Sequence, residues 1–209
     1  MGNLFTIGHS QHTVNYFVAL LKKYNINYVL DVRSTPYSKY AEQFNRENIS
    51  SFLNKVNINY SFMGKYFGAR PLEKSLYAAE GYLDFEKVAQ SERFNKAMEN
   101  VILGLEGGNK IALMCTEKDP IDCHRAIMVS RAFNKKKGIE VEHILPNGDI
   151  QTQKELDNRL VNKYFANRGQ LSLFNYEDTM SEEEYISQAY HKRNEEIGYR
   201  IEQKETLIL

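Results

Sequence analysis

Short apolar runs separated by amphipathic stretches predict strands that alternate with helices along the chain. Apolar runs such as Leu4–Ile7 and Lys110–Cys115 have the length of buried strands. The stretch after Thr13, a residue suited to a helix N-cap, carries apolar residues at helical spacing. This alternation predicts an α/β fold, with a mostly parallel sheet flanked by helices and joined by right-handed crossovers. The expected strands cover residues 4–7, 28–32, 59–62, 110–115 and 141–144.

The expected helices also have recognisable ends. Gly107 and Gly108 follow one helical stretch, and Gly138 has the position of a C-cap glycine. We divide the chain into an α/β domain at residues 1–150 and a helical C-terminal extension with an acidic tail at residues 151–209. Besides the helix after Thr13, helices are expected at residues 46–55, 84–105, 153–165 and 181–197 and in the stretch after Arg125.

Chemically active side chains gather where the predicted strands end. Thr6–Ser10 ends the first strand, Asp31–Arg33 the second and Met114–Glu117 the fourth, while Cys123–Arg125 begins a helix. In parallel sheets, ligands bind beyond the carboxyl ends of the strands. The residues that we expect to face one pocket at this edge are His9, Asp31, Arg33, Cys115, Glu117 and Arg125.

Cationic and polar groups at the same edge predict a site for an anion. Arg125 at a helix start, beside free backbone N–H groups, suits phosphate, carboxylate or sulfate. The alternative is that Arg125 pairs with Asp119 or Asp122 and only closes the loop. The residues expected to hold the ligand are Ser10, Arg33, Cys123, His124 and Arg125.

Four residues at this edge are candidates for the chemistry itself: Cys115, Glu117, Asp31 and His9. A cation and a helix N-terminus near Cys115 would favour its thiolate, which is a nucleophile. Glu117 suits a nucleophile or a base, and His9 with Asp31 suits acid–base work. The alternatives are that Cys115 is a small buried side chain and that Asp31 and Arg33 form a buried ion pair. Cys115 and Arg125 stand too far apart for the usual phosphatase loop.

The two cysteines leave a metal or redox site as a further alternative. Cys115, Cys123 and His124, with His9 as an additional candidate, offer zinc-type ligand atoms. Seven residues separate the two cysteines, which is not a common zinc spacing, so the sequence assigns no metal. Because the chain has no other cysteine, we expect two reduced thiols in a cytoplasmic protein rather than a disulfide.

Composition and charge exclude some classes of protein. The chain is 42% hydrophobic and 26% charged, which is ordinary for a globular protein. No apolar run is long enough for a membrane span and the first residues lack a secretory pattern, so a cytoplasmic location is expected. Residues 175–209 contain nine acidic and four basic residues, whereas the preceding residues carry an excess of five basic ones. Such asymmetry is compatible with nucleic-acid contact, although an ordinary solvated surface explains it more simply.

Aromatic residues in the predicted loops are a second feature that is compatible with nucleic-acid binding. Aromatic side chains near a basic pocket stack on nucleobases in some proteins, although most loop aromatics cap the core. The residues concerned are Tyr37, Phe44, Tyr60, Tyr66, Phe67, Tyr77 and Tyr82.

Together these segments resemble a bacterial family known as domain of unknown function 488. The resemblance covers about residues 4–144 and depends on the order of the segments rather than on any one of them. Phe67–Arg70 departs from a Leu-Gly-Gly run that is frequent in the family. The resemblance implies the fold and the site, and it implies no reaction. The matching positions are Thr6–Ser10, Asp31–Ser34, Pro36, Ser38, Phe44, Asn45, Gly68, Met114–Glu117, Pro120, Cys123–Arg125 and Val141–Ile144.

A separate pentapeptide, Gln170-Leu171-Ser172-Leu173-Phe174, resembles the motif with which bacterial DNA polymerases and repair proteins bind the sliding clamp. Gln170 would form hydrogen bonds, and Leu173 with Phe174 would fill an apolar pocket. The alternative is that the apolar residues of the pentapeptide cover the domain core.

These observations support three classes of function. The one we favour is an enzyme, such as a hydrolase or glycosidase, that acts on a nucleotide or on DNA in repair or defence. The second is a non-enzymatic nucleotide- or DNA-binding module that docks on the clamp. The third is a metal or redox site built on Cys115 and Cys123. The sequence identifies no substrate, cofactor or oligomeric state.

Overall fold

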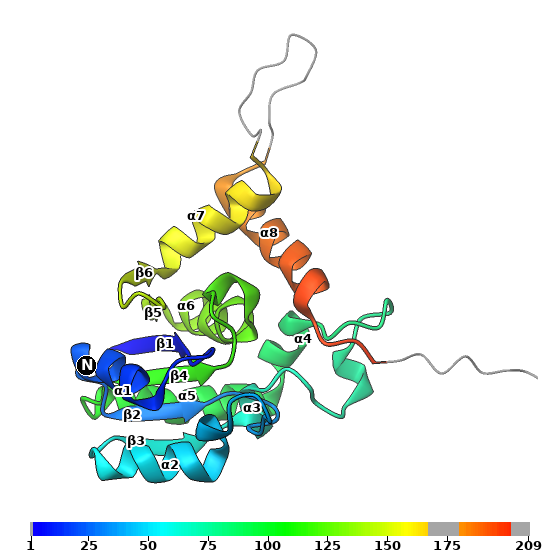
Figure 1. Ribbon diagram of the computed structural model, residues 1–209. Helices are drawn as coiled ribbons and strands as arrows, with labels where there is room; N and C mark the ends of the chain where they lie inside the picture. Colours follow the sequence, from blue (N-terminus) through cyan, green and yellow to red (C-terminus); the bar gives the residue numbers. More distant parts are fainter. Residues whose placement is uncertain (1, 167–179, 202–209) are drawn as a thin grey trace, which may run out of the picture.

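One six-stranded sheet organises the molecule. The computed structural model describes residues 2–166 and 180–201, and within them the strand order is β3-β2-β4-β1-β5-β6 (Figure 1). β1 to β5 pair in parallel, and β6 pairs antiparallel with β5. The predicted α/β fold is therefore confirmed. The strands are β1 Leu4–Gly8, β2 Tyr28–Asp31, β3 Asn59–Phe62, β4 Ile111–Cys115, β5 Val141–Ile144 and β6 Ile150–Thr152.

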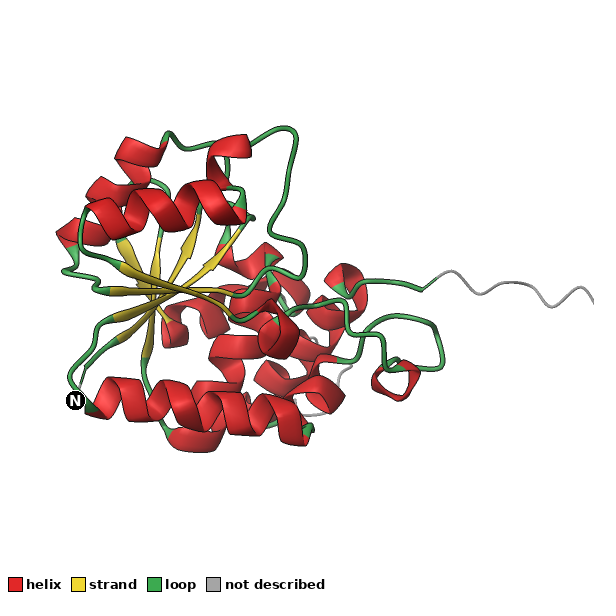
Figure 2. Cartoon of the chain, turned by 90° about the horizontal axis from the view of Figure 1, so that it is seen from below, coloured by secondary structure: helices red, strands yellow, loops and turns green. Residues whose placement is uncertain are grey.

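Burial on both faces explains why the central strands are continuous apolar runs. Helices cover both faces of the sheet (Figure 2), and every residue of β1 and β4 is buried. Side chains alternate between the faces along a strand. Val29 of β2 joins a core cluster with residues of the first two helices, whereas Leu30 joins a second cluster on the opposite face. We call the face that contains Val29 and is covered by the first two helices the first-helix face. The opposite face, which contains Leu30, is called the second-helix face.

The helices follow the sequence pattern closely at several ends. Thr13 accepts a hydrogen bond from the Tyr16 amide at 3.3 Å, and Gly138 ends a helix with a φ of 63°. None of the helices within the described ranges combines the length and apolar character that a membrane crossing needs. The α-helices are α1 Val14–Lys23, α2 Arg46–Lys55, α3 Gly64–Phe67, α4 Phe85–Gln90, α5 Glu92–Glu106, α6 Arg131–Lys137, α7 Gln153–Tyr164 and α8 Glu182–Ile197. Short 3-10 turns lie at η1 Glu42–Phe44, η2 Lys74–Leu76 and η3 Pro120–Asp122, and a π-helix at η4 Arg125–Ser130.

Three elements differ from the sequence prediction. The helix expected at 84–105 is broken at Ser91, whose backbone is extended and whose hydroxyl caps α5. Ser competes with the helix through such side-chain bonds, which explains the break. The short helix α3 at Gly64–Phe67 and the edge strand β6, which follows Gly148 with its φ of 83°, are additional to the expected elements.

The C-terminal helices pack on the body of the sheet. α7 and α8 lie side by side (Figure 1). Leu160 of α7 and Ala189 of α8 belong to the same core cluster as Leu113 of β4. The division of the chain at residue 150 stays a prediction.

We predict that Gly8→Ala destabilises the protein and displaces the loop after β4. A Cβ at Gly8 would lie 1.9 Å from the Glu117 carbonyl oxygen and 3.2 Å from Arg125 Nη2. Overpacking of this kind costs about 1–3 kcal/mol or more in unfolding free energy. Urea denaturation measures the loss. In the control Gly104→Ala, the new Cβ meets the flexible end of Ile111 at 3.2 Å, and the change should stay below about 1 kcal/mol. Equal stability of Gly8→Ala and the natural protein would contradict the prediction.

Candidate functional site

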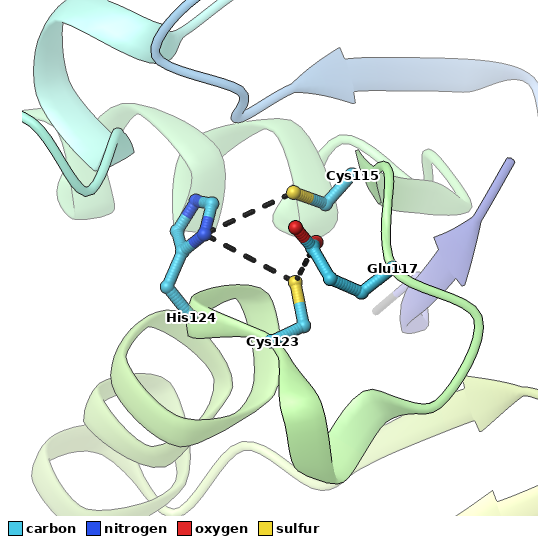
Figure 3. Close-up of side chains that lie close together, drawn as sticks. All are labelled: Cys115, Glu117, Cys123 and His124. Carbon is cyan, nitrogen blue, oxygen red and sulfur yellow. Dashed lines mark hydrogen bonds between the residues drawn. The ribbon is translucent and has the colours of Figure 1, made fainter. Parts of the chain in front are cut away.

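Four potential ligand groups converge at the carboxyl end of β4. Cys115 ends the strand, Glu117 follows in the loop, and Cys123 and His124 precede η4 (Figure 3). One donor atom from each lies within 4.8 Å of those from the others. The Cys115 Sγ is 3.8 Å from His124 Nδ1, and the Cys123 Sγ is 4.0 Å from the same nitrogen and 2.8 Å from Glu117 Oε2. We call these four residues the quartet.

The orientation of His124 is fixed by the neighbouring strand. Its Nε2 lies 3.0 Å from the Val32 carbonyl oxygen at the end of β2. A carbonyl oxygen only accepts hydrogen bonds, so Nε2 carries the hydrogen in the neutral ring. The lone pair of Nδ1 is then directed toward the two sulfur atoms. This is the tautomer that a metal-binding or hydrogen-bond-accepting histidine needs.

Arg125 lies behind the quartet and holds its loop. The side chain is fully buried, and it donates hydrogen bonds to the carbonyl oxygens of Glu117 at 2.8 Å and Lys118 at 3.5 Å. The Arg125 amide lies 3.4 Å from Cys123 Sγ.

The alternative that Arg125 pairs with an aspartate of its loop is wrong. Asp119 pairs with Arg159, and Asp122 pairs with Arg193. Because the Arg125 guanidinium is buried behind the loop, its binding of an external anion stays a prediction.

Burial and neighbouring groups shift the pKa values of the two thiols in opposite directions. Burial raises the pKa of Cys115 well above its usual value. Burial also opposes ionisation of Cys123, but a hydrogen bond from Cys115 and the charge of Arg125 outweigh it and lower the pKa of Cys123. Burial, followed by the charge of Cys123, raises the pKa of Glu117. Both cysteines are free and buried, and their reduced state in the cell stays a prediction.

A second polar cluster forms around the end of β2. Arg33 donates to both carboxylate oxygens of Asp31, at 2.8 and 2.5 Å, and to the Phe44 carbonyl at 2.9 Å. The Tyr60 hydroxyl donates to Asp31 at 2.7 Å. Asp31 is fully buried and Arg33 is 5% exposed. The structural alternative for this pair, a buried ion pair that orders the following loop, is therefore present.

His9 belongs to this second cluster. Its ring stacks on Phe44 with centroids 4.3 Å apart, Nδ1 donates to the Ser10 carbonyl, and Nε2 lies 3.2 Å from Arg33 Nη1. Burial, reinforced by the charge of Arg33, lowers the pKa of His9 to about 4. The ring is thus neutral near pH 7, and its role in proton transfer stays a prediction.

Strand register places the two clusters on opposite faces of the sheet. Asp31 is the neighbour of Met114, so it points to the first-helix face, while Cys115 points to the second-helix face. Asp31 and Cys115 therefore leave the same edge of the sheet from opposite faces, and the expectation that Arg33 and Arg125 face one pocket stays a prediction.

Backbone bonds beyond the sheet join the two clusters. The His9 amide donates to the Cys115 carbonyl at 2.9 Å, and the Ser10 amide to the Thr116 carbonyl at 2.8 Å. Ser10 has a φ of 44°, which is uncommon for a residue with a side chain. Its part in ligand binding stays a prediction.

Sequence reasoning missed the partners that hold the site. Tyr60 was expected to stack bases or cap the core, and its hydroxyl instead binds Asp31. Most of the other loop aromatics do cap the core: Phe44, Phe67, Tyr77 and Tyr82 are buried, whereas Tyr37 and Tyr66 are exposed. The Val32 carbonyl carries no sequence signal, since any residue there would supply it.

A separate cavity of about 710 Å³ lies between α4, η4, α6 and α8, away from the strand ends. The cationic side chains of Arg131, Lys135 and Lys136 line this cavity, which is a feature of anion-binding sites. However, Arg131 lies 3.9 Å from Asp157, Lys135 pairs with Glu86, and Lys136 donates to Asn95. The quartet is therefore the stronger candidate.

We predict that Asp31→Asn is far more destabilising than removal of a surface ion pair. The variant leaves the buried Arg33 cation without its counter-charge, which costs about 3–5 kcal/mol. The matched control is Glu73→Gln, which removes the exposed partner of Arg93 and should cost about 0–1 kcal/mol. Chemical denaturation of both variants gives the comparison, and equal losses would show that the Asp31 pair has no special role.

Comparison with known proteins identifies a family for this chain. The family described as Domain of unknown function DUF488 matches residues 13–132. This range includes the whole quartet and all of the second polar cluster except His9. No curated protein and no solved structure matches the chain. The chain belongs to the DUF488 family.

Proposed function

We propose that the quartet binds a divalent transition-metal ion, with zinc as the best match. The observation that carries the proposal is the convergence of two sulfur atoms, one imidazole nitrogen and one carboxylate within 4.8 Å. Cysteine, histidine and carboxylate are the ligands that Zn²⁺ takes in proteins, usually four in a tetrahedral arrangement. The bond from His124 Nε2 to the Val32 carbonyl supplies the outer contact that metal-binding histidines commonly have.

The distances are close to those of a tetrahedral centre. Zn–S bonds of about 2.3 Å and Zn–N bonds of about 2.0 Å place sulfur and nitrogen about 3.5 Å apart. The two Sγ to His124 Nδ1 distances, 3.8 and 4.0 Å, exceed this by only a few tenths of an ångström. The Cys123 Sγ to Glu117 Oε2 distance of 2.8 Å has to widen. Small rotations of side chains would complete the centre.

Charge also favours a bound cation. Two thiolates and a carboxylate bring three negative charges into a largely buried site, and a buried charge is costly unless it is paired. A divalent ion leaves one negative charge, and the guanidinium of Arg125, fully buried behind the loop, offsets it. The uncommon spacing between Cys115 and Cys123 does not oppose this proposal, because the sheet and η4 position the ligands here rather than a small zinc module.

We predict that the metal-free, reduced protein binds one Zn²⁺ per chain. Cys123→Ser and His124→Ala each remove a ligand, so the Kd should rise by more than the roughly 10–100-fold typical of losing an outer-shell partner. Competition with a chromophoric chelator measures the Kd, and circular dichroism confirms that the variants are folded. The control His191→Ala, at an exposed position of α8, should keep the natural affinity. Natural affinity in the two ligand variants would overturn the proposed centre.

The second candidate function is an enzyme that acts on a nucleotide or on DNA. Tyr37 and Tyr40, which follow β2, are 52% and 98% exposed, and Tyr66, which follows β3, is 41% exposed. All three lie beyond the carboxyl ends of strands, as the quartet does. Exposed aromatics at a ligand-binding edge suit the stacking of bases, and the excess of basic residues before residue 175 suits a phosphate backbone.

The sliding clamp is the partner that we propose for such an enzyme, in repair or defence. The motif Gln170-Leu171-Ser172-Leu173-Phe174 lies outside the described residues.

We predict that changing Tyr37, Tyr40 and Tyr66 together to alanine weakens binding of single-stranded DNA. Each stacked base is worth about 1–3 kcal/mol, so the Kd should rise at least about fivefold. Fluorescence anisotropy with a labelled oligonucleotide measures the change. The control is Tyr199→Ala, which removes a 41% exposed tyrosine that stacks on Arg70. Equal binding by the triple variant and the natural protein would remove the support for this second function.

A further inference from the structure

We propose that Glu117 is an exchangeable ligand, so that metal held by Cys115, Cys123 and His124 opens its fourth position to water or a small anion. This inference rests on the proposed metal centre. It makes the centre a catalytic one, because catalytic zinc sites keep three protein ligands and leave one position open, whereas structural sites are closed.

Three members of the quartet are held by the scaffold. Cys115 ends a fully buried central strand and is 2% exposed. Cys123 is 1% exposed, and its Sγ lies 3.4 Å from the Arg125 amide. His124 is fixed by the bond from Nε2 to the Val32 carbonyl at 3.0 Å. Each has an anchor outside the quartet, so none can leave without breaking a contact of the fold.

Glu117 is held differently. Its backbone carbonyl is fixed by Arg125, but its carboxylate interacts with the quartet itself, through Cys123 at 2.8 Å. The side chain is partly exposed, and it comes from the loop between β4 and η3 rather than from a strand or helix. The loop backbone can therefore stay in place while the flexible side chain rotates toward solvent.

Charge selects the ligand that replaces the carboxylate. Two thiolates, a neutral imidazole and a divalent ion sum to zero, and the buried Arg125 adds one positive charge. The open position therefore favours an anion or a water that becomes hydroxide. If such a water ionised, its O–H bond would break, the released Glu117 carboxylate would take the proton, and the electron pair would stay on the oxygen.

The same residue types occur in a known reaction class. Zinc deaminases of nucleobases hold the ion with histidine and cysteine and use a glutamate that is not a ligand as the acid and base. Glu117 stands two residues after Cys115, so it stays near the metal when it is released. The chemistry that this arrangement supports is hydrolytic attack by metal-bound water on a carbon or phosphorus centre.

Cobalt substitution tests the inference without a substrate. Co²⁺ replaces zinc, its sulfur charge-transfer bands in the near ultraviolet report the thiolates, and its visible bands report the fourth ligand. We expect sodium azide to change the visible bands of the natural protein saturably and to leave the charge-transfer bands in place. Glu117→Gln should keep the sulfur bands and bind azide more tightly. Its Co²⁺ affinity should fall by no more than the roughly 10–100-fold of an outer-shell loss.

The outcomes separate the two proposals. Failure to obtain sulfur charge-transfer bands with Co²⁺ would overturn the metal centre itself. Sulfur bands with visible bands that azide leaves unchanged in the natural protein would keep the centre and overturn the exchange of Glu117. A Glu117→Gln variant that loses Co²⁺ as completely as Cys123→Ser would also show Glu117 to be a firm ligand.

Discussion

The guanidinium of Arg125 holds the loop after β4 against the start of η4, and the quartet depends on that contact. It fixes the carbonyl oxygens of Glu117 and Lys118 and is fully buried, so its charge acts through protein rather than water. A buried cation needs nearby negative charge. The quartet lies beside it, and binding of the proposed metal would ionise both thiols, so this position suits two cysteines and a carboxylate.

The second polar cluster supports the quartet from the opposite face. The Asp31–Arg33 ion pair fixes the chain where it leaves β2, and Arg33 ties that segment to the Phe44 carbonyl. Val32 lies between the paired residues, so its carbonyl is held in the position that orients His124. The backbone at the end of β2 thus connects the second polar cluster to the quartet.

Local pattern predicts most of the fold and less of the site. The buried runs of β1 and β4, the cap at Thr13 and the glycine at 138 are local signals, and the structure contains them. The π-helix η4 packs against α4, α8, β1 and β4, and within it the Ser130 hydroxyl donates to the Arg125 carbonyl. The sequence gives no sign of this element. Strand register likewise decides that Asp31 and Cys115 point to opposite faces. Candidate residues can therefore be chosen from strand ends, but their grouping requires the structure.

X-ray absorption spectroscopy of the zinc-loaded protein tests the central claim, that the four side chains form one metal centre. The account predicts a shell of two sulfur atoms at about 2.3 Å and a shell of nitrogen and oxygen atoms at about 2.0–2.2 Å. Histidine scattering should be present from His124. A spectrum with nitrogen and oxygen ligands alone would contradict the account, because both buried cysteines would then lie outside the metal's coordination shell.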